Sequence, residues 1–444
     1  MNRAIGETYS MSILILFLFV ILLSGSQLVY SSMFIEPFRD SKEIFQALII
    51  VGIVVLMAFH KHLSWGWTSR PDTIEIIVGL IVLYATVIFY LTPDRLNAVS
   101  KLLNIQLYCL FMLMARRWLV LHQNRPVKLL ISVIVGTGFL TSLYGILQFF
   151  DRDFLFVPTQ EFDEIRWVIS GFIGQQTLFA GVLAMVFPLG VSLGVNSENR
   201  SGRWVALIAS GTIFTTITLT HTRAAVLACF GALGFGILIH VLRRNRRQII
   251  RFLMCLISAT LIFLGLLYLV PSIHSRMTTD VNLASSSIHA RTHYWMACEK
   301  MIREKPLMGY GLGRFPFDYR DFQIRLRQEG IDTFRNAEFV THPHNEFLLI
   351  WIEAGLIGLI LTICFLITCV VRCYRLMGSS RPGDRHWMVL AATMSMISGM
   401  IDACFSFPFH IASSALIMVV MSAIVMSHPT SEPARSVGQA SRHE

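Results

Sequence analysis

Twelve apolar runs divide this chain of 444 residues, and no other feature constrains its fold as strongly. They cover about residues 11–31, 44–59, 74–92, 102–115, 129–150, 171–196, 204–220, 224–241, 252–270, 346–371, 387–407 and 411–427. Because hydrophobic residues make up 54% of the chain and charged residues only 14%, these runs are too many for a soluble core. A bilayer offers the backbone no water to bond with, so each run is expected to form a helix. We therefore predict an all-α polytopic membrane protein with about twelve transmembrane helices.

Cations gather in alternate short connections between these runs, and this pattern predicts the orientation of the chain. The basic residues on that side are Lys61, Arg70, Arg116, Arg117, Arg125, Lys128, Arg200, Arg203, Arg243, Arg244, Arg246, Arg247, Arg251, Arg372, Arg375, Arg381 and Arg385. The connection over 151–170, on the other side, is net acidic. Short basic connections stay in the cytoplasm, so both termini are predicted to be cytoplasmic.

One large hydrophilic block lies between the ninth and tenth runs, and the same pattern places it outside the cytoplasm. We predict nine transmembrane helices over 1–270, this large loop over 271–343, three helices over 344–427 and a cytoplasmic tail over 428–444. The loop contains ten Lys or Arg residues, namely Arg276, Arg291, Lys300, Arg303, Lys305, Arg314, Arg320, Arg325, Arg327 and Arg335. Many fixed cations at a membrane surface suggest chemistry on a lipid-bound anion.

The loop ends in Thr-His-Pro-His-Asn-Glu over 341–346, immediately before the tenth run. A histidine at the water interface can accept a proton near neutral pH, which makes His344 a candidate general base. Gly355 and Gly358 follow within the run, where small residues allow close helix packing that would fix the turn before it. The alternative is an interfacial histidine that only caps a helix, and the spacing alone does not decide between these two interpretations.

Two arginines on the same predicted side are candidate anion ligands. Arg223 lies in a very short connection, Thr-His-Thr-Arg over 220–223, where a charge is costly unless it meets an anion or an acid. Arg291 begins Arg-Thr-His-Tyr-Trp, in a predicted amphipathic helix over 288–304 that a glycine-rich turn follows. The alternatives are an arginine bound to lipid headgroups or helix carbonyls, and an ordinary solvated charge.

Together these patterns resemble the O-antigen ligase and polymerase superfamily, and the O-antigen ligases most closely. The residues that carry the resemblance are His344-Asn345 with Gly355 and Gly358, the Arg223 turn, and Arg291, Trp295, Lys305-Pro306, Gly309 and Gly311. The resemblance implies a glycosyltransferase of the bacterial inner membrane, with a twelve-helix architecture of the GT-C type and one large periplasmic helical loop. Its implied donor is a polysaccharide on undecaprenyl pyrophosphate, and its implied acceptor is a sugar hydroxyl of lipid A-core. Membrane lipids are the other expected partners, and nucleic acid is not expected.

Carried over by motif, the resemblance implies that His344 is the catalytic base and that Arg223 and Arg291 hold the pyrophosphate in a periplasmic active site. Guanidinium forks suit a multiply charged leaving group, so neither a metal nor another cofactor is expected. A base opposite the leaving group predicts a single displacement that inverts the anomeric centre. Additional substrate-binding residues are expected at Arg166, Gln175, Arg314 and Asn345.

Several alternatives stay open at this stage. Asp151-Arg152-Asp153 could hold a divalent cation, although the pair offers few ligands. Asp402, deep in the eleventh run, is an intramembrane carboxylate that is either functional or paired with an inward arginine. A polymerase and a protein O-oligosaccharyltransferase are close functional alternatives, and a membrane transporter is a more distant one. The short tail after the last run favours the ligase over the protein-modifying relatives, and we find no similarity between the two halves that would favour a transporter.

Overall fold

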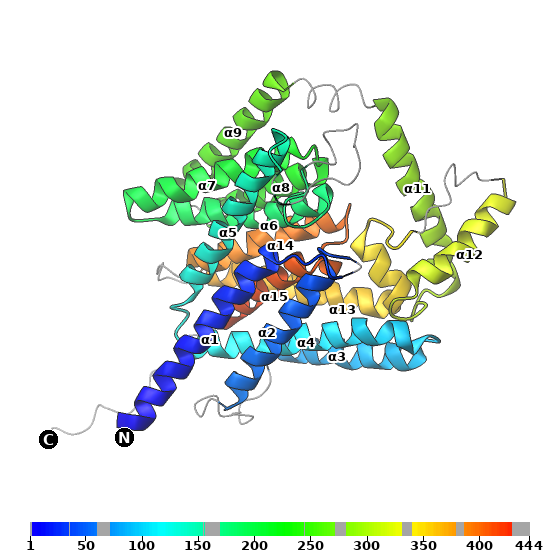
Figure 1. The fold of residues 1–444 in the computed structure, drawn as a ribbon, viewed down its shortest axis with the longest axis horizontal. Helices are drawn as coiled ribbons and strands as arrows, with labels where there is room; N and C mark the ends of the chain where they lie inside the picture. The colour runs from blue at the N-terminus through cyan, green and yellow to red at the C-terminus, as the bar shows by residue number, and fades with distance from the viewer. Residues whose placement is uncertain are drawn as a thin grey trace.

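The computed structural model describes residues 2–34, 36–59, 72–153, 155, 169–243, 245–270, 281–330, 340–378 and 386–428, which fold into helices and no strand (Figure 1). Each predicted apolar run coincides with one helix. These helices are α1 (Asn2–Leu28), α2 (Asp40–Phe59), α3 (Thr73–Leu91), α4 (Arg95–Leu121), α5 (Val127–Phe149), α6 (Gln176–Asn196), α7 (Arg200–Leu219), α8 (Arg223–Leu242), α9 (Arg246–Leu269), α13 (Glu346–Leu376), α14 (His386–Ala403) and α15 (Ala412–Ser427). Ten helices in the described part of the chain are long and apolar enough to cross a membrane. The protein is therefore an all-helical polytopic membrane protein, as predicted.

The core of the bundle is built from helices that are apolar on all sides. In the apolar stretch of α6, 89% of the residues are buried inside the protein, whereas in the apolar stretch of α9 the share is 11%. Figure 1 shows α14 and α15, in orange and red, in the middle of the bundle, where α14 packs on α6 and α8 and α15 packs on α4. A helix that is hydrophobic all round belongs in the interior, whereas one such as α9 presents most of its side chains to lipid.

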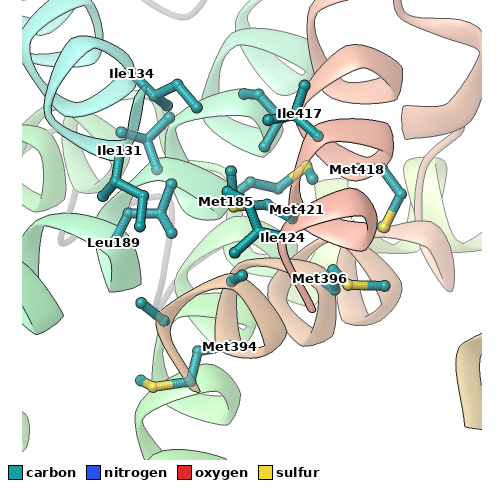
Figure 2. Packing of buried hydrophobic residues seen from close by; sticks show 14 of the residues in the cluster. Ile131, Ile134, Met185, Leu189, Met394, Met396, Ile417, Met418, Met421 and Ile424 are labelled. Carbon is teal, nitrogen blue, oxygen red and sulfur yellow. The ribbon is translucent and has the colours of Figure 1, made fainter. Parts of the chain in front are cut away.

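Methionines fill much of this core. Figure 2 shows Met185 of α6 among Met394 and Met396 of α14 and Met418 and Met421 of α15. The unbranched thioether chain adapts to irregular gaps, which suits helices that cross at different angles. The centre of the bundle therefore holds packed apolar side chains, and the polar candidate residues lie toward the helix ends.

The large loop forms two helices that have a hydrophobic cluster of their own. They are α11 (Val281–Glu304) and α12 (Phe315–Gln328), which lie beside the N-terminal end of α13 in Figure 1. The cluster contains Ala297, Cys298, Met301, Tyr310, Phe315, Tyr319, Phe322, Leu326, Leu349 and Ile352. Leu349 and Ile352 belong to α13, so the first turns of this helix pack against the loop.

Helix α13 is broken at Gly355, which has φ 67° and ψ −176°. The break leaves the carbonyls of the preceding turn without their usual partners four residues on. Two backbone N–H groups of the loop replace them: Tyr310 donates to the Ile352 oxygen at 2.7 Å, and Gly311 donates to the Glu353 oxygen at 3.0 Å. The glycine-rich turn of the loop thus completes the hydrogen bonding of a membrane helix.

The other side of the break is satisfied in the same way, because the N–H of Leu356 donates to the Pro306 oxygen at 2.9 Å. A Cβ atom at Gly355 would lie 2.0 Å from the Leu307 oxygen, so only glycine fits here. We expected Gly355 and Gly358 to allow close packing between continuous helices. At Gly355 the structure differs: the glycine breaks its helix and admits a loop instead of a neighbouring helix.

Candidate functional site

His344 lies in the turn before α13 with a positive φ of 52°, a conformation that is uncommon for a residue other than glycine. Hydrogen bonds hold the chain on both sides of it. The indole N–H of Trp295, in α11, donates to the Pro343 oxygen at 3.1 Å. The Asn345 side chain accepts the N–H of Leu348 at 3.1 Å and caps α13. The backbone of His344 is therefore fixed by the loop and by the helix together.

Two aromatic rings contact the imidazole of His344. The Tyr294 ring of α11 stacks on it at 6.1 Å between centroids, and the Phe407 ring after α14 lies at 5.5 Å. Burial lowers the pKa of His344 to about 4, and the positive charge of Arg291 acts in the same direction. The imidazole is therefore neutral at physiological pH, which is the form that accepts a proton.

Arg291 is within electrostatic reach of two titratable groups from different parts of the chain. Its charge acts on His344 and on the carboxylate of Asp402 in α14. Asp402 is 2% exposed and approaches Gly181 of α6, and its Oδ1 accepts no hydrogen bond from the residues that the structure describes. No ion pair joins Asp402 to an arginine among the described residues, so its role stays open. Arg291 is thus close enough to His344 for its charge to act on the imidazole.

A second polar cluster lies next to the His344 turn. Glu346, whose side chain is 1% exposed, approaches His410 with 2.9 Å between Oε1 and Nδ1, in ion-pair range but not in hydrogen-bond orientation. His410 belongs to the short helix η2 (Pro408–His410) between α14 and α15. The His342 ring stacks on Phe407 at 4.2 Å and meets the His410 ring at 5.2 Å. These contacts join the turn that carries His344 to the α14–α15 connection.

Arg223 is the first residue of α8 and has an exposed side chain. The turn before it is tight: His221 has φ 57°, and the hydroxyls of Thr220 and Thr222 are 3.0 Å apart. This turn places Arg223 at the end of the bundle where α7 ends and α8 begins. Arg291 acts on His344 through its charge, and the convergence of Arg223 on these two residues stays a prediction.

The additional substrate-binding candidates have different surroundings. The Arg314 guanidinium donates twice to Asp318, with both distances 2.9 Å, so this arginine already has a carboxylate partner. Asn345 uses its side-chain oxygen as the cap of α13. Gln175 is half-buried and immediately precedes α6. Arg166 lies outside the described residues.

The Asp151-Arg152-Asp153 segment does not present two free carboxylates. Asp153 accepts hydrogen bonds from the Tyr144 hydroxyl, from the Gln148 amide at 2.9 Å and from the N–H of Leu155 at 3.2 Å. A divalent cation prefers oxygen ligands and would have to displace these donors. In the described ranges, no three His, Cys, Asp or Glu side chains gather as a metal site would require.

Sequence reasoning missed Tyr294, Phe407, Glu346 and His410. Glu346 directly follows His344-Asn345, so its place in the motif was visible even though its partner was not. The signal for the partner was the polar His410 in the short connection between the last two apolar runs, where a charged or polar residue at membrane depth points to function. Tyr294 lies three residues after Arg291 on α11, on the same side of that helix.

The fold and this geometry define a polytopic helical membrane protein with a neutral imidazole beside a guanidinium at one end of its bundle. Residues 205–363 match the family described as O-Antigen ligase. The matched segment makes up about a third of the chain, and Arg223, Arg291 and His344 all lie within it.

One curated relative agrees with this family. A protein of Rickettsia conorii (strain ATCC VR-613 / Malish 7), which carries the provisional name of a polysaccharide ligase, is 31% identical over 145 residues. The match covers 31% of this chain and 33% of the relative, so the chain spans about a third of the length of the relative that it matches. The likeness is thus confined to part of both proteins.

Proposed function

We propose that this protein is an O-antigen ligase, which transfers a polysaccharide from undecaprenyl pyrophosphate to a sugar hydroxyl of lipid A-core. The observation that carries the proposal is the neutral, half-buried His344 within reach of the Arg291 charge, inside the segment that matches the ligase family. A neutral base and a fixed cation are the two groups that such a transfer requires.

The transfer is a single displacement at the anomeric carbon. The acceptor hydroxyl oxygen forms a bond to that carbon, and its proton passes to His344. The bond from the anomeric carbon to the pyrophosphate oxygen breaks, and its electron pair stays on the departing phosphate. Arg291 and Arg223 stabilise that negative charge through planar two-point hydrogen bonds. Attack opposite the leaving group inverts the anomeric centre.

Binding of the donor makes His344 a stronger base. Arg291 disfavours a second positive charge on His344, and this repulsion contributes to the low pKa of the imidazole. A pyrophosphate bound to Arg291 brings negative charge that offsets the guanidinium, so the pKa of His344 rises when the donor is bound. General bases act best when their pKa is close to the working pH. Proton transfer is therefore favoured in the complex with the donor.

The proposed location is the bacterial inner membrane, with the His344 end of the bundle on the periplasmic side and both chain ends in the cytoplasm. Its support is the distribution of cations in the short connections. Reporter fusions to the chain ends and to the 329–340 segment test it. An active cytoplasmic reporter within that segment would contradict the proposed orientation.

The lipopolysaccharide profile of a strain that lacks the protein tests the proposed reaction. A ligase predicts loss of all O-antigen bands together with accumulation of lipid-linked polymer. Lipid A-core capped by a single repeat unit would indicate a polymerase, and loss of glycan from proteins with normal lipopolysaccharide would indicate a protein-modifying enzyme. Complementation by the wild-type chain but not by His344→Ala would tie the reaction to this site.

A further inference from the structure

A cluster of arginines lies at the end of the bundle opposite His344, where α6 and α8 end and α7 and α9 begin. Segments 196–203 and 243–251 contain seven arginines and a single acid, Glu198. Six of them belong to the described residues, namely Arg200, Arg203, Arg243, Arg246, Arg247 and Arg251, and Arg244 lies outside those residues. The guanidinium of Arg243 stacks on Tyr374 near the end of α13, 4.0 Å from the ring centre, which places the cluster far from the turn that starts α13.

The positions of these charges are unfavourable for the helices themselves. Both α7 and α9 start in this cluster, with arginines and no acidic residue in their first turns. The N-terminus of a helix carries partial positive charge and is stabilised by anions. Two helix starts and several guanidinium groups therefore add up to a positive field, against which these two segments supply a single acid, Glu198.

Hydrogen bonds join the C-terminal end of α6 to the N-terminal ends of α7 and α9. Arg251 of α9 donates to the Val195 oxygen at 3.1 Å, and Arg203 of α7 donates to the Ser197 oxygen at 2.9 Å. Gln248 adds an amide contact to α6, with 3.1 Å to the Asn196 oxygen. The carbonyls at the end of α6 thus offset part of the charge of two arginines.

Positive charge remains after these contacts. The charges of Arg203 and Arg247 both act repulsively on Arg251. The Nε–H of Arg203 is buried and has no hydrogen-bond partner among the described residues. A buried donor without a partner is costly, so the hydrogen bonding of this guanidinium is incomplete within the described part of the chain.

The surface next to the cluster is suited to a lipid. Trp204 follows Arg203 and is 56% exposed, and tryptophan is enriched at the level of lipid headgroups. Farther along the same two helices, exposed apolar side chains face outward, including Val205 and Ile208 of α7 and Met254 and Ile257 of α9. An anionic head group at the arginines would therefore continue into acyl chains along α7 and α9.

We propose that the cluster formed by Arg203, Arg247 and Arg251 binds the phosphate of an anionic phospholipid from the adjacent leaflet. Guanidinium groups match phosphate oxygens in two-point geometry, and basic pockets between helix ends are typical sites for such head groups. The site is separate from the proposed transfer reaction and does not depend on it.

The test uses the purified full-length chain in a neutral detergent. Native mass spectrometry counts bound lipid during titration with phosphatidylglycerol or, for comparison, with phosphatidylcholine. We expect saturable binding of phosphatidylglycerol only. The variant R203Q/R247Q should bind it about 30-fold more weakly, because each basic group near an anionic lipid contributes roughly a factor of five. The control variant R125Q/K128Q removes two exposed cations, one from the connection between α4 and α5 and one from the first turn of α5, and should bind as the wild type does.

Three results would overturn the proposal. They are equal binding of the two lipids, equal loss of binding in the two double variants, and full displacement of the lipid by about 10 mM inorganic phosphate, which would indicate an ion site instead of a lipid site. Should R203Q/R247Q fail to fold, the exposed Arg247 can be changed alone. The variant R247Q should lower the affinity about fivefold, and an unchanged affinity would again count against the site.

Discussion

Replacing Gly355 with alanine should release the large loop from α13. An alanine in the conformation of Gly355 costs about 1–3 kcal/mol in backbone strain alone, before its Cβ meets the Leu307 oxygen at 2.0 Å. The helix can avoid the strain and the clash only by closing the break. Closing it removes the hydrogen bonds from Leu356 to Pro306 and from the loop to α13. Three well-formed bonds cross the break, and each contributes about 0.5–1.5 kcal/mol. We therefore expect the docked state to lose about 3 kcal/mol.

The thiol of Cys298 reports this release directly. Cys298 is fully buried in the cluster between the loop and α13, and burial raises the pKa of its thiol well above the ordinary range. Alkylation therefore requires local opening. A loss of about 3 kcal/mol raises the open population about 100-fold. Site-specific mass spectrometry after treatment with N-ethylmaleimide measures the rate at Cys298, with the buried Cys229 of α8 as the internal reference.

The matched control is Gly79→Ala in α3, because a Cβ atom there meets nothing within 4 Å and the residue is helical. This variant should label Cys298 at the wild-type rate. Equal labelling in Gly355→Ala and Gly79→Ala would refute the argument that the loop is held through the broken helix. Faster labelling of Cys229 as well would show general unfolding and not release of the loop.

The remaining predictions concern the proposed transfer. His344→Ala should lower the transfer rate by about 10²–10⁴ at unchanged abundance, whereas His342→Ala should be milder; equal losses would indicate a structural turn. Because burial and Arg291 lower the pKa of His344 to about 4, the neutral base persists as pH falls. The value of kcat/KM for the free enzyme should therefore stay level down to about pH 5 and be halved near pH 4; a fall centred near pH 6.5 would contradict this. Lys in place of Arg223 or Arg291 keeps the positive charge but loses the planar two-point hydrogen bonds of the guanidinium, and should reduce transfer strongly. EDTA should leave transfer unchanged, and inhibition by EDTA that Mg²⁺ reverses would support a metal-dependent mechanism. Glu346→Gln should lower kcat by about 10- to 100-fold with little change in KM, through a loosened His344 turn, and an unchanged kcat would exclude that role.

The sequence predicted the helices well because the bilayer decides them. Every apolar run coincides with a helix, because an unpaired backbone is too costly in hydrocarbon and a helix pairs its backbone within one segment. The motif resemblance assigned Arg291 and His344 to one site, although 53 positions (344 − 291) separate the two residues, and their joint role in that site stays a prediction.

The details that position the site depend on long-range contacts that no local pattern contains. Glycine is common in membrane helices, so Gly355 gave no sign that its helix breaks there. The break depends on the segment from Pro306 to Gly311, more than forty positions earlier in the chain. The partner of Glu346 is equally remote, because His410 follows another complete helix.

The break in α13 also has a consequence for how the protein is assembled. The segment that fills it, 306–311, precedes α13 in the chain and is therefore synthesised first. When α13 enters the bilayer, its carbonyls at Ile352 and Glu353 need partners that an uninterrupted helix would supply from within. The loop segment is already made at that moment and can provide them. Docking of the loop thus comes before the final shape of the helix, so a chain whose loop cannot reach α13 cannot form the turn that orients His344.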